Sequence, residues 1–430
     1  MKVNSASKDV WLAAISKELK PMDDLKVWDV IELSPAFKLV GTTWVFKVTK
    51  VHLCKVVEHK VRLCAQGITQ TAGVDFEKTY SPTGRLNSLC TLIAFAAGNC
   101  LLFHQIDIKR AFLNKLLTEC VYLSIPQGLS QDQKKFFLRL NKAIYGLKQA
   151  PLAWYKSIFG KDVESFKAEI SREFEIKNIG EANLMLGVEV TQNEDFIALD
   201  QQNFSESLLL LYGMSDCRPV APPLVPNNHL SLENEVELSL FNSLGISYRS
   251  AIDSINYLRT ATRPDLSYAV SSLSQFLEQP GINHWKAFLH VLRYLKGTQD
   301  LALTYLWDNN SGIVACSDVD WGNCPYTQRQ WHEEGALWDS GLGLPIHKEN
   351  QGCIDAASGN SGVNGRRMKH VDIQIHFVKE AISGAKTRLV YTLTSKMLAD
   401  FLTKSVSWVV LVKALCCLCV LPLKAREDVE

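Results

Sequence analysis

The sequence predicts an α+β protein with several domains. A chain of 430 residues is long enough to form two to four separate hydrophobic cores. Its hydrophobic fraction of 47% and charged fraction of 21% are typical of globular proteins. Stretches with strand-like alternation and stretches with helix-like spacing of apolar residues both occur along the chain, and this mixture is the basis for the α+β assignment.

The first predicted elements are a helix and a β-hairpin. Apolar residues at helical spacing predict an amphipathic helix within residues 6–35, followed by a short strand. These apolar residues are Trp11, Ile15, Leu19 and Met22. GTTWVFKV (41–48) and HKVRLCAQG (59–67) alternate between apolar and polar residues, so they are predicted to be two strands joined by a polar hairpin region.

A buried helix and a buried strand are predicted next. SLCTLIAFAAGNC (88–100) is mostly apolar, and Gly98-Asn99 is a typical helix stop. LLFHQIDI (101–108) is predicted to be a buried strand with Asp107 near its C-terminal end. A carboxylate at the end of a central strand often holds a catalytic ion, and it is equally often a cap.

The same patterns predict the remaining elements. Residues 161–178 are predicted to form a charged helix and residues 184–192 a strand. A linker is predicted where four prolines fall close together, at Pro219, Pro222, Pro223 and Pro226. The C-terminal half is predicted to contain a pair of helices, two strands and a further helix, at residues 246–300, 301–307, 312–321 and 366–382.

Charge and cysteine content narrow the classes of function. The chain has 46 basic and 45 acidic residues, whereas nucleic-acid enzymes usually show a basic surplus. It has only local basic clusters, such as Lys47, Lys60 and Arg62, and an exposed strand face also explains these. The twelve cysteines lack the paired spacing of zinc sites, so we expect free thiols in a reducing compartment, the cytoplasm or the nucleus.

The C-terminal tail is apolar between residues 406 and 423. This stretch has about the minimum length of a membrane span, and Lys413 lies in its middle. A buried terminal helix, or sequence drift after loss of selection, is favoured over a transmembrane helix.

Ten sequence blocks, in this order, resemble the copia-type retrotransposon Pol polyproteins. The resemblance runs from about residue 6 to residue 405. The blocks are GTTWVFKV, VRLCAQGITQTAGVDFEKTYSP, HQIDIKRAFLN, YGLKQAPLAWY, LGVEV, TRPDLSYAVS, HWKAFLHVLRYLKGT, SDVDW, KHVDIQIHFVKE and LADFLTK. The resemblance implies a reverse transcriptase, a connection and a ribonuclease H, in that order.

In the reverse transcriptase, the resemblance implies that Asp107 is the first metal-binding aspartate. It implies that Lys60 and Arg62 lie in the fingers, near the triphosphate of the incoming nucleotide. It also implies a nucleotide- and template-binding role for the YGLKQAP segment, through Tyr145, Gly146 and Gln149. Simple turn chemistry is the alternative explanation of Gly146.

The sequence departs from the family directly after this segment. The family continues into a hairpin with two adjacent aspartates, whereas here Tyr155 is followed at once by Lys156. No Asp-Asp pair occurs anywhere in the 430 residues. Nucleotidyl transfer needs several carboxylates to hold two divalent ions, so we expect no polymerase activity.

In the ribonuclease H, the resemblance implies metal-binding aspartates at Asp318 and Asp400. Glu349 stands where the family usually has an aspartate, and its carboxylate can also bind a cation. The family's glutamate-bearing helix is not visible, because after Thr327-Gln328-Arg329 the chain jumps to Trp331-His332-Glu333-Glu334. Glu333 and Glu334 are the alternative candidates for the missing glutamate. Without the resemblance, Asp318 would be interpreted as part of a strand-end turn.

The resemblance implies an incomplete reverse transcriptase palm and fingers, a helical connection and an incomplete ribonuclease H-like mixed sheet. The corresponding domains are the fingers and palm (1–217, deleted after about 155), a linker (218–236), thumb-like connection helices (237–305), the ribonuclease H-like domain (306–405, deleted after about 330) and the apolar tail (406–430).

The expected function is that of an inactive reverse transcriptase and ribonuclease H fragment. In intact relatives Mg²⁺ would be the cofactor, and an RNA/DNA template-primer or hybrid would be the partner. Two alternatives stay open: a non-catalytic nucleic-acid-binding remnant, and a gene prediction that omits parts of an intact polymerase. Reading the transcript across Tyr155/Lys156 and Gln330/Trp331 would test the second alternative.

Overall fold

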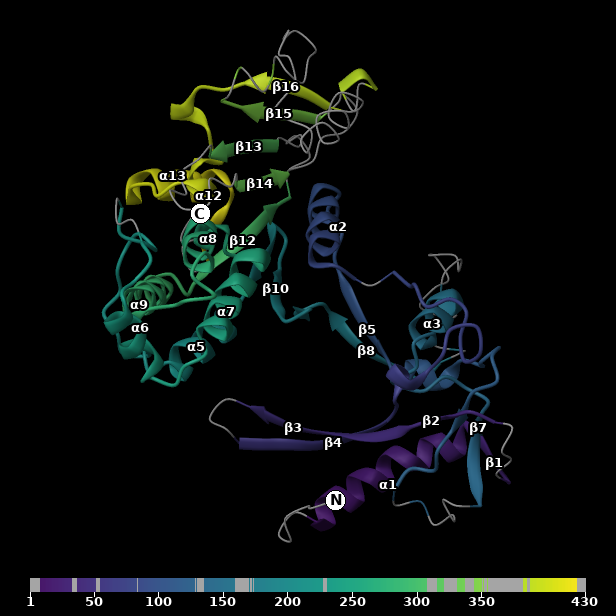
Figure 1. The fold of residues 1–430 in the computed structure, drawn as a ribbon. Coiled ribbons are helices and arrows are strands. Elements are labelled where there is room, and N and C mark those ends of the chain that lie inside the picture. Colours follow the sequence, from purple (N-terminus) through teal and green to yellow (C-terminus); the bar gives the residue numbers. More distant parts are fainter. Residues whose placement is uncertain are drawn as a thin grey trace, which may run out of the picture. The chain divides into compact units, whose positions relative to one another are not determined.

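The computed structural model divides the chain into two compact units. Unit 1 comprises Met1–Arg85 and Gln105–Gly180, and unit 2 comprises Leu86–His104 and Glu181–Glu430 (Figure 1). The residues that the structure describes are 8–32, 37–51, 55–82, 84–127, 129, 135–158, 170, 172, 174–226, 230–307, 315–320, 331–336, 344–349, 351, 354, 382–384 and 387–423.

Unit 1 begins with a helix that packs on a β-hairpin. Helix α1 (Lys8–Asp24) is followed by the antiparallel pair β3 (Thr42–Val51) and β4 (Lys55–Ala65). The Trp11 ring lies edge-on against Phe46 and His59, with centroids 5.1 and 4.7 Å apart. The helix and hairpin predicted from the sequence are therefore confirmed.

The rest of unit 1 surrounds a four-stranded sheet. Its strand order is β1-β7-β6-β2, and its apolar side chains share a core with Leu63 and Ala65 from the hairpin. The strands of this sheet are β1 (Trp28–Glu32), β2 (Leu39–Val40), β6 (Tyr122–Leu123) and β7 (Phe136–Leu140). Helix α3 (Ala150–Ile158) and the short 3-10 turns η3 (Gly67–Thr69) and η4 (Ala111–Asn114) complete the described part.

Strands β5 (His104–Ile108) and β8 (Ile176–Glu181) form a separate two-stranded sheet. No residue of β5 is buried, so the prediction of a buried strand at 101–108 is wrong. A strand becomes buried when neighbouring strands and helices cover it, and among the described residues β5 pairs with β8 alone. The helix predicted at 161–178 lies mostly outside the described residues, and its last residues, from Ile176, belong to β8.

Unit 2 contains a five-stranded sheet with the order β17-β12-β11-β10-β9. Its strands are β9 (Leu184–Met185), β10 (Val188–Gln192), β11 (Phe196–Asp200), β12 (Leu301–Leu306) and β17 (Val420–Pro422). The strand predicted at 184–192 is therefore two strands, because Gly187, at φ +82°, allows the chain to reverse between them.

Helix α2 (Leu86–Gly98) covers this sheet with one face only. Leu89 and Ile93 pack among the sheet residues, whereas Leu92 and Phe95 are more than half exposed. The predicted helix and its stop at Gly98 are confirmed, and its burial is confirmed for one face. The sequence could not show this, because the helix is apolar on both faces.

Further helices pack together in unit 2, with Tyr294 and Phe288 fully buried among them. Residues 246–300 are predicted to form two helices, and the structure has three α-helices there, α7, α8 and α9. The helices are α5 (Gln202–Leu211), α6 (Glu235–Asn242), α7 (Tyr248–Ala261), α8 (Ser267–Ser274), α9 (Ile282–Gly297), α12 (Asp400–Thr403) and α13 (Trp408–Cys417), with the 3-10 turns η5 (Pro264–Leu266) and η6 (Thr394–Lys396).

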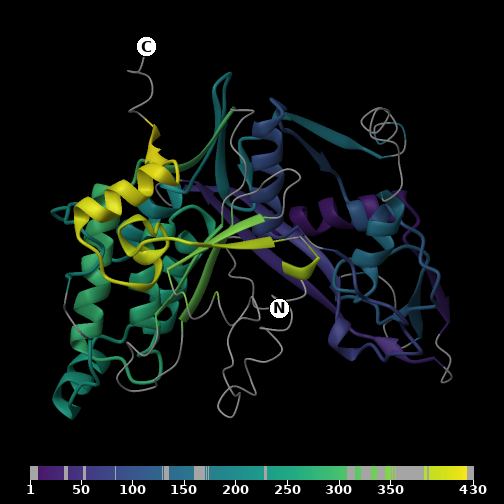
Figure 2. The same ribbon diagram turned by 90° about the horizontal axis from the view of Figure 1, so that it is seen from above.

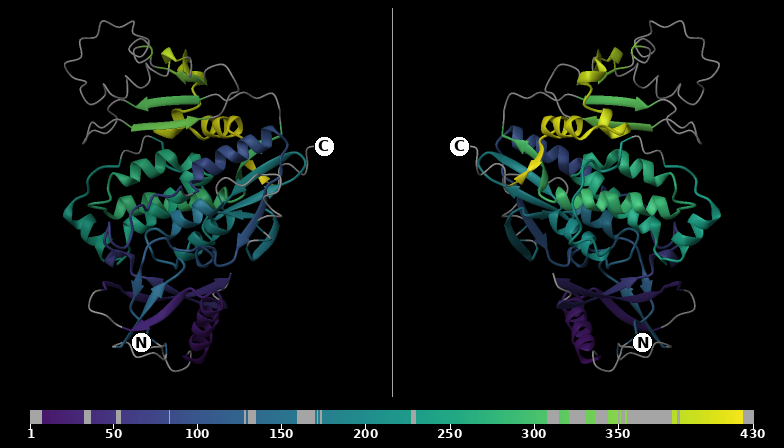
Figure 3. Two further views of the ribbon diagram at one scale, coloured as in Figure 1. Left: turned by 90° about the vertical axis from the view of Figure 1, so that its right-hand side faces the viewer. Right: turned by 90° about the vertical axis from the view of Figure 1, so that its left-hand side faces the viewer.

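Helix α13 is the start of the apolar tail. Leu411 and Leu415 are buried in the same core as α9, and Figures 2 and 3 show the helix lying against the helices of its unit. The expected terminal helix is thus confirmed, but it is buried on one face only, since Val409 and Val410 are exposed. In the described part of the chain, every helix is too short or too polar to cross a bilayer.

A second sheet of unit 2 has the order β14-β13-β15-β16. Strands β13 (Ala315–Asp320) and β14 (Trp331–Ala336) are antiparallel, whereas β15 (Leu344–Lys348) is parallel to both β13 and β16 (Thr387–Tyr391). The mixed α/β content agrees with the predicted α+β class. The helix predicted at 366–382 lies almost entirely outside the described residues.

Candidate functional site

Three exposed cations, Lys47, Lys60 and Arg62, form a basic face on the β3–β4 hairpin. Lys60 lies directly opposite Lys47 in the strand register, and Arg62 lies two residues further along β4 on the same face. All three side chains are exposed, and α1 packs on the other face. Like charges directly opposite each other weaken the pairing of two strands, so this face carries uncompensated positive charge between Lys47 and Lys60.

Arg62 also contacts Tyr145. Its guanidinium carbon lies 4.8 Å from the centre of the Tyr145 ring, and the Phe112 ring meets the same tyrosine edge-on at 5.3 Å. Burial raises the pKa of the Tyr145 hydroxyl, and the positive charge of Arg62 opposes this shift. Two of the residues expected in the nucleotide site, which lie 83 positions apart, are therefore brought together.

Gly146 is fixed by the close approach of two backbone segments. It has φ +89°, and a Cβ atom there would lie 2.1 Å from the carbonyl oxygen of Ala65. The Ala65 amide donates a hydrogen bond of 2.8 Å to the carbonyl of Tyr145. Only glycine combines this conformation with this proximity, so turn geometry accounts for the residue.

Gln149 is buried in a polar network, with 2% of its surface exposed. Its carbonyl oxygen accepts a hydrogen bond from Gln70 Nε2 (3.1 Å), and its amide nitrogen donates to the backbone oxygen of Asp75 (2.8 Å). The carboxylate of Asp75 accepts in turn from the Thr71 amide (2.7 Å) and from Lys38 Nζ (3.2 Å). Gln149 therefore shapes the loop, and its contact with a nucleotide or template stays a prediction.

Asp107 is exposed near the end of β5 and is followed by two cations. Lys109 Nζ and Arg110 Nη1 form ion pairs with Glu175, at 2.5 and 3.4 Å. Within the described residues, no group of three or more histidine, cysteine, aspartate or glutamate side chains is placed to hold a metal ion. Among the residues that the structure describes, Asp107 is therefore not part of the cluster of carboxylates that a two-ion site requires.

Glu349 and Asp400 meet in unit 2. Glu349 directly follows β15, and Asp400 is the first residue of α12. Lys404 Nζ lies 3.1 Å from Glu349 Oε1 and 3.1 Å from Asp400 Oδ1. Cys316 pairs with His347 across the parallel strands β13 and β15, and Asp318 and Glu349 each follow this pair by two residues along the chain.

The sequence comparisons show which proteins this chain is similar to. Residues 25–160 match the family described as reverse transcriptase (RNA-dependent DNA polymerase). The Retrovirus-related Pol polyprotein from transposon TNT 1-94 of Nicotiana tabacum is 27% identical over 93% of this chain. The corresponding polyproteins from transposons RE2 and RE1 of Arabidopsis thaliana are 28% and 27% identical, each over 94% of this chain.

The chain belongs to the copia-type retrotransposon Pol polyproteins. It spans about a third of the length of these relatives, at 37%, 34% and 33% of each. The first alignment runs over 493 positions but covers only 93% of 430 residues, about 400, so about 90 positions of that Pol polyprotein have no counterpart here. An internal deletion in this chain leaves unmatched positions of this kind in the relative.

Among the side chains that the structure describes, the copia-type residues that remain do not fit divalent ions at either place. The side chain of Asp318 lies outside the described residues. Asp107 is a single exposed carboxylate next to Lys109 and Arg110. Glu349 and Asp400 already have an ammonium group between them. We therefore derive no catalytic step through Mg²⁺ at these residues.

Sequence reasoning missed Lys404. The signal was present, because Lys404 follows Asp400 by four residues in LADFLTK, and residues at this spacing face each other on a helix. Its second contact, with Glu349, spans 55 positions and has no local signal.

Sequence reasoning also missed a buried ion pair in the TRPDLSYAVS block. Arg263 Nη2 lies 2.7 Å from Asp265 Oδ2, and Arg263 Nη1 donates to the backbone oxygen of Thr298 (2.8 Å). The Tyr294 hydroxyl donates to Asp265 Oδ2 (2.8 Å). These bonds fasten η5 to the end of α9, which gives this block a structural role.

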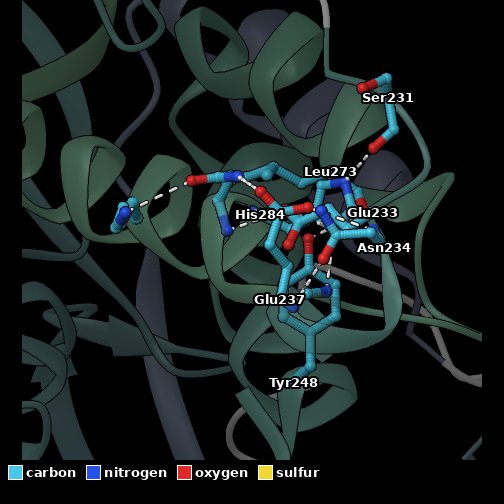
Figure 4. Close-up of polar contacts among 10 residues, drawn as sticks. Ser231, Glu233, Asn234, Glu237, Tyr248, Leu273 and His284 are labelled. Carbon is cyan, nitrogen blue, oxygen red and sulfur yellow. Dashed lines mark hydrogen bonds and ion pairs between the residues drawn. The ribbon is translucent and has the colours of Figure 1, made fainter. Parts of the chain in front are cut away.

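The predicted linker is fastened to the start of α9 (Figure 4). Glu233 Oε1 accepts from the backbone amides of Asn283 (2.8 Å) and His284 (3.1 Å). His284 Nδ1 accepts from the Gly281 amide (2.9 Å), so the ring is neutral, with its proton on Nε2 facing the Ser231 oxygen. Burial lowers the pKa of His284, in agreement with the neutral form.

Proposed function

We propose that this chain is a reverse transcriptase and ribonuclease H fragment without polymerase activity. The observation that carries the proposal is the isolation of Asp107. Its side chain is exposed, cations follow it in the chain, and the described residues form no group of three or more histidine, cysteine, aspartate or glutamate side chains that could hold a metal ion with it. In intact relatives, two magnesium ions held by several carboxylates would activate the primer hydroxyl and stabilise the leaving pyrophosphate.

The state of strand β5 supports the same conclusion. Catalytic carboxylates need a rigid strand to hold them in place, and a strand becomes rigid when it is paired and covered on both sides. Among the described residues β5 pairs only with β8, and neither strand contains a buried residue. The strands that would carry the missing aspartates would also supply that cover.

A primer-extension assay tests the proposal. The purified chain is given an RNA homopolymer template with a DNA primer and labelled deoxynucleotide, in Mg²⁺ and separately in Mn²⁺. We expect no incorporation above that of a matched Asp107→Asn variant, and an active reverse transcriptase serves as the positive control. Incorporation that Asp107→Asn abolishes would refute the proposal.

The basic face of the hairpin supports a second candidate function, the binding of nucleic acid without catalysis. Lys47, Lys60 and Arg62 are exposed on one face, and Lys47 and Lys60 are directly opposed. Such a cluster attracts phosphate groups and releases their counterions, so binding weakens as the salt concentration rises.

Fluorescence anisotropy with a labelled RNA·DNA hybrid tests this second candidate. The slope of log K against log [salt] is negative for a protein that binds phosphate groups. If the face binds phosphate, the double variant Lys47→Gln/Lys60→Gln has a slope that is smaller in magnitude by about 2. Lys8→Gln, an exposed lysine at the start of α1, is the matched control and leaves the slope unchanged. Equal slopes for all three proteins would exclude this face as the contact.

A further inference from the structure

The carboxylates of Glu349 and Asp400 share one partner, the ammonium group of Lys404. The two distances are equal, at 3.1 Å, and each is within the normal range of a hydrogen bond from a nitrogen to an oxygen. We infer that Lys404 is the resident cation of this carboxylate pair, so that the pair fastens β15 to α12 and does not take up a divalent ion.

The position of Lys404 is fixed by the buried residues beside it. Phe401 and Thr403, in the same turn of chain, are 3% and 7% exposed, and Phe401 belongs to the main core of unit 2. The side chain of Lys404 is 31% exposed, and those of Glu349 and Asp400 are 23% and 16% exposed. The ammonium group is thus held at the pair by packing as well as by charge.

A divalent ion would need the oxygens that Lys404 already contacts. Mg²⁺ binds carboxylate oxygens at about 2.0–2.1 Å, so an ion on Glu349 Oε1 and Asp400 Oδ1 would lie close to the ammonium group. Like charges at that separation repel strongly in a partly buried site. The other oxygen of Glu349, Oε2, is buried and has no hydrogen-bond partner among the described residues.

The inference extends the proposed loss of catalysis to the second catalytic region of the family. It rests on that proposal only through the family assignment of Glu349 and Asp400. Its test measures metal binding and unfolding, and not DNA synthesis. A failure of one proposal can therefore be told from a failure of the other.

Manganese binding to the full-length chain tests the inference. We expect the wild-type chain and Lys404→Arg, which keeps the charge, to bind Mn²⁺ equally weakly in titrations followed by electron paramagnetic resonance. Lys404→Met removes the charge and is expected to bind one Mn²⁺ at least about tenfold more tightly. Lys396→Met, at an exposed lysine of the same region, is the matched control and behaves as the wild type.

Glu349→Gln gives an independent test if Lys404→Met does not fold. If Lys404 is the resident cation, Glu349→Gln lowers the melting temperature and leaves Mn²⁺ binding unchanged. If Glu349 is a metal ligand, the substitution weakens Mn²⁺ binding at least about tenfold. That loss of binding, or equal Mn²⁺ affinity of wild type and Lys404→Met, would overturn the inference.

Discussion

Replacing Gly146 with alanine tests whether backbone proximity determines this position. The new Cβ would lie 2.1 Å from the Ala65 oxygen, so the two segments must separate by about 1 Å to reach normal contact. The positive φ of +89° costs a further 1 kcal/mol or so in any residue with a Cβ. Weakening the bond between the Ala65 amide and Tyr145 costs about 1 kcal/mol more.

The total is a loss of about 3 kcal/mol in the free energy of unfolding of unit 1, once the strain of separating the segments is added. Gly73→Ala is the matched control, because Gly73 has a similar φ of +78° but open space where its Cβ would lie. We expect that control to lose only about 1 kcal/mol.

Urea unfolding of both variants, followed by tryptophan fluorescence, provides the measurement. Trp28 and Trp44 report on unit 1, which contains both glycines. Hydrogen exchange at the Ala65 amide should also accelerate in Gly146→Ala and not in Gly73→Ala. Equal destabilisation of the two variants would show that backbone conformation alone, and not the approach of Ala65, makes glycine necessary.

Three further predictions concern buried polar groups. Asp265→Asn leaves the charge of Arg263 without its partner and should lower the unfolding free energy of unit 2 by about 3 kcal/mol in thermal melts. Gln149→Leu removes two buried hydrogen bonds and should cost unit 1 about 2 kcal/mol by urea titration, whereas no loss would show that the network is dispensable. Burial, with Glu189 alongside, raises the pKa of Asp200 to about 6, from 3.8. Between these values the folded state binds more protons than the unfolded chain, so stability falls as the pH rises from about 4 to about 6; Asp200→Asn should flatten this profile and add about 2 kcal/mol at pH 7.

Much of the local structure could be predicted from the sequence. Alternation in GTTWVFKV predicted β3, because the side chains of a strand alternate between its two faces whatever surrounds it. Helical spacing predicted α1, and Gly98-Asn99 predicted the end of α2, since both signals lie within a few residues. The order of the blocks predicted the family, and the comparisons confirmed it.

The burial of these elements could not be predicted in the same way. The segment LLFHQIDI (101–108) begins with an apolar run, and the sequence alone suggested a buried strand, but burial depends on neighbours that lie far away in the chain. For the same reason, one face of α2 is exposed although most residues of the helix are apolar. An apolar pattern indicates that a segment can be buried, and only the tertiary structure shows whether it is.

The sequence by itself determined the family and the absence of an Asp-Asp pair, because both are properties of the order of residues. The tertiary structure alone decided which charges meet. It brings Arg62 to Tyr145 and places Lys404 between Glu349 and Asp400. Electrostatic interactions depend on distances in space, and contacts between residues that lie 55 or 83 positions apart leave no local pattern in a single sequence.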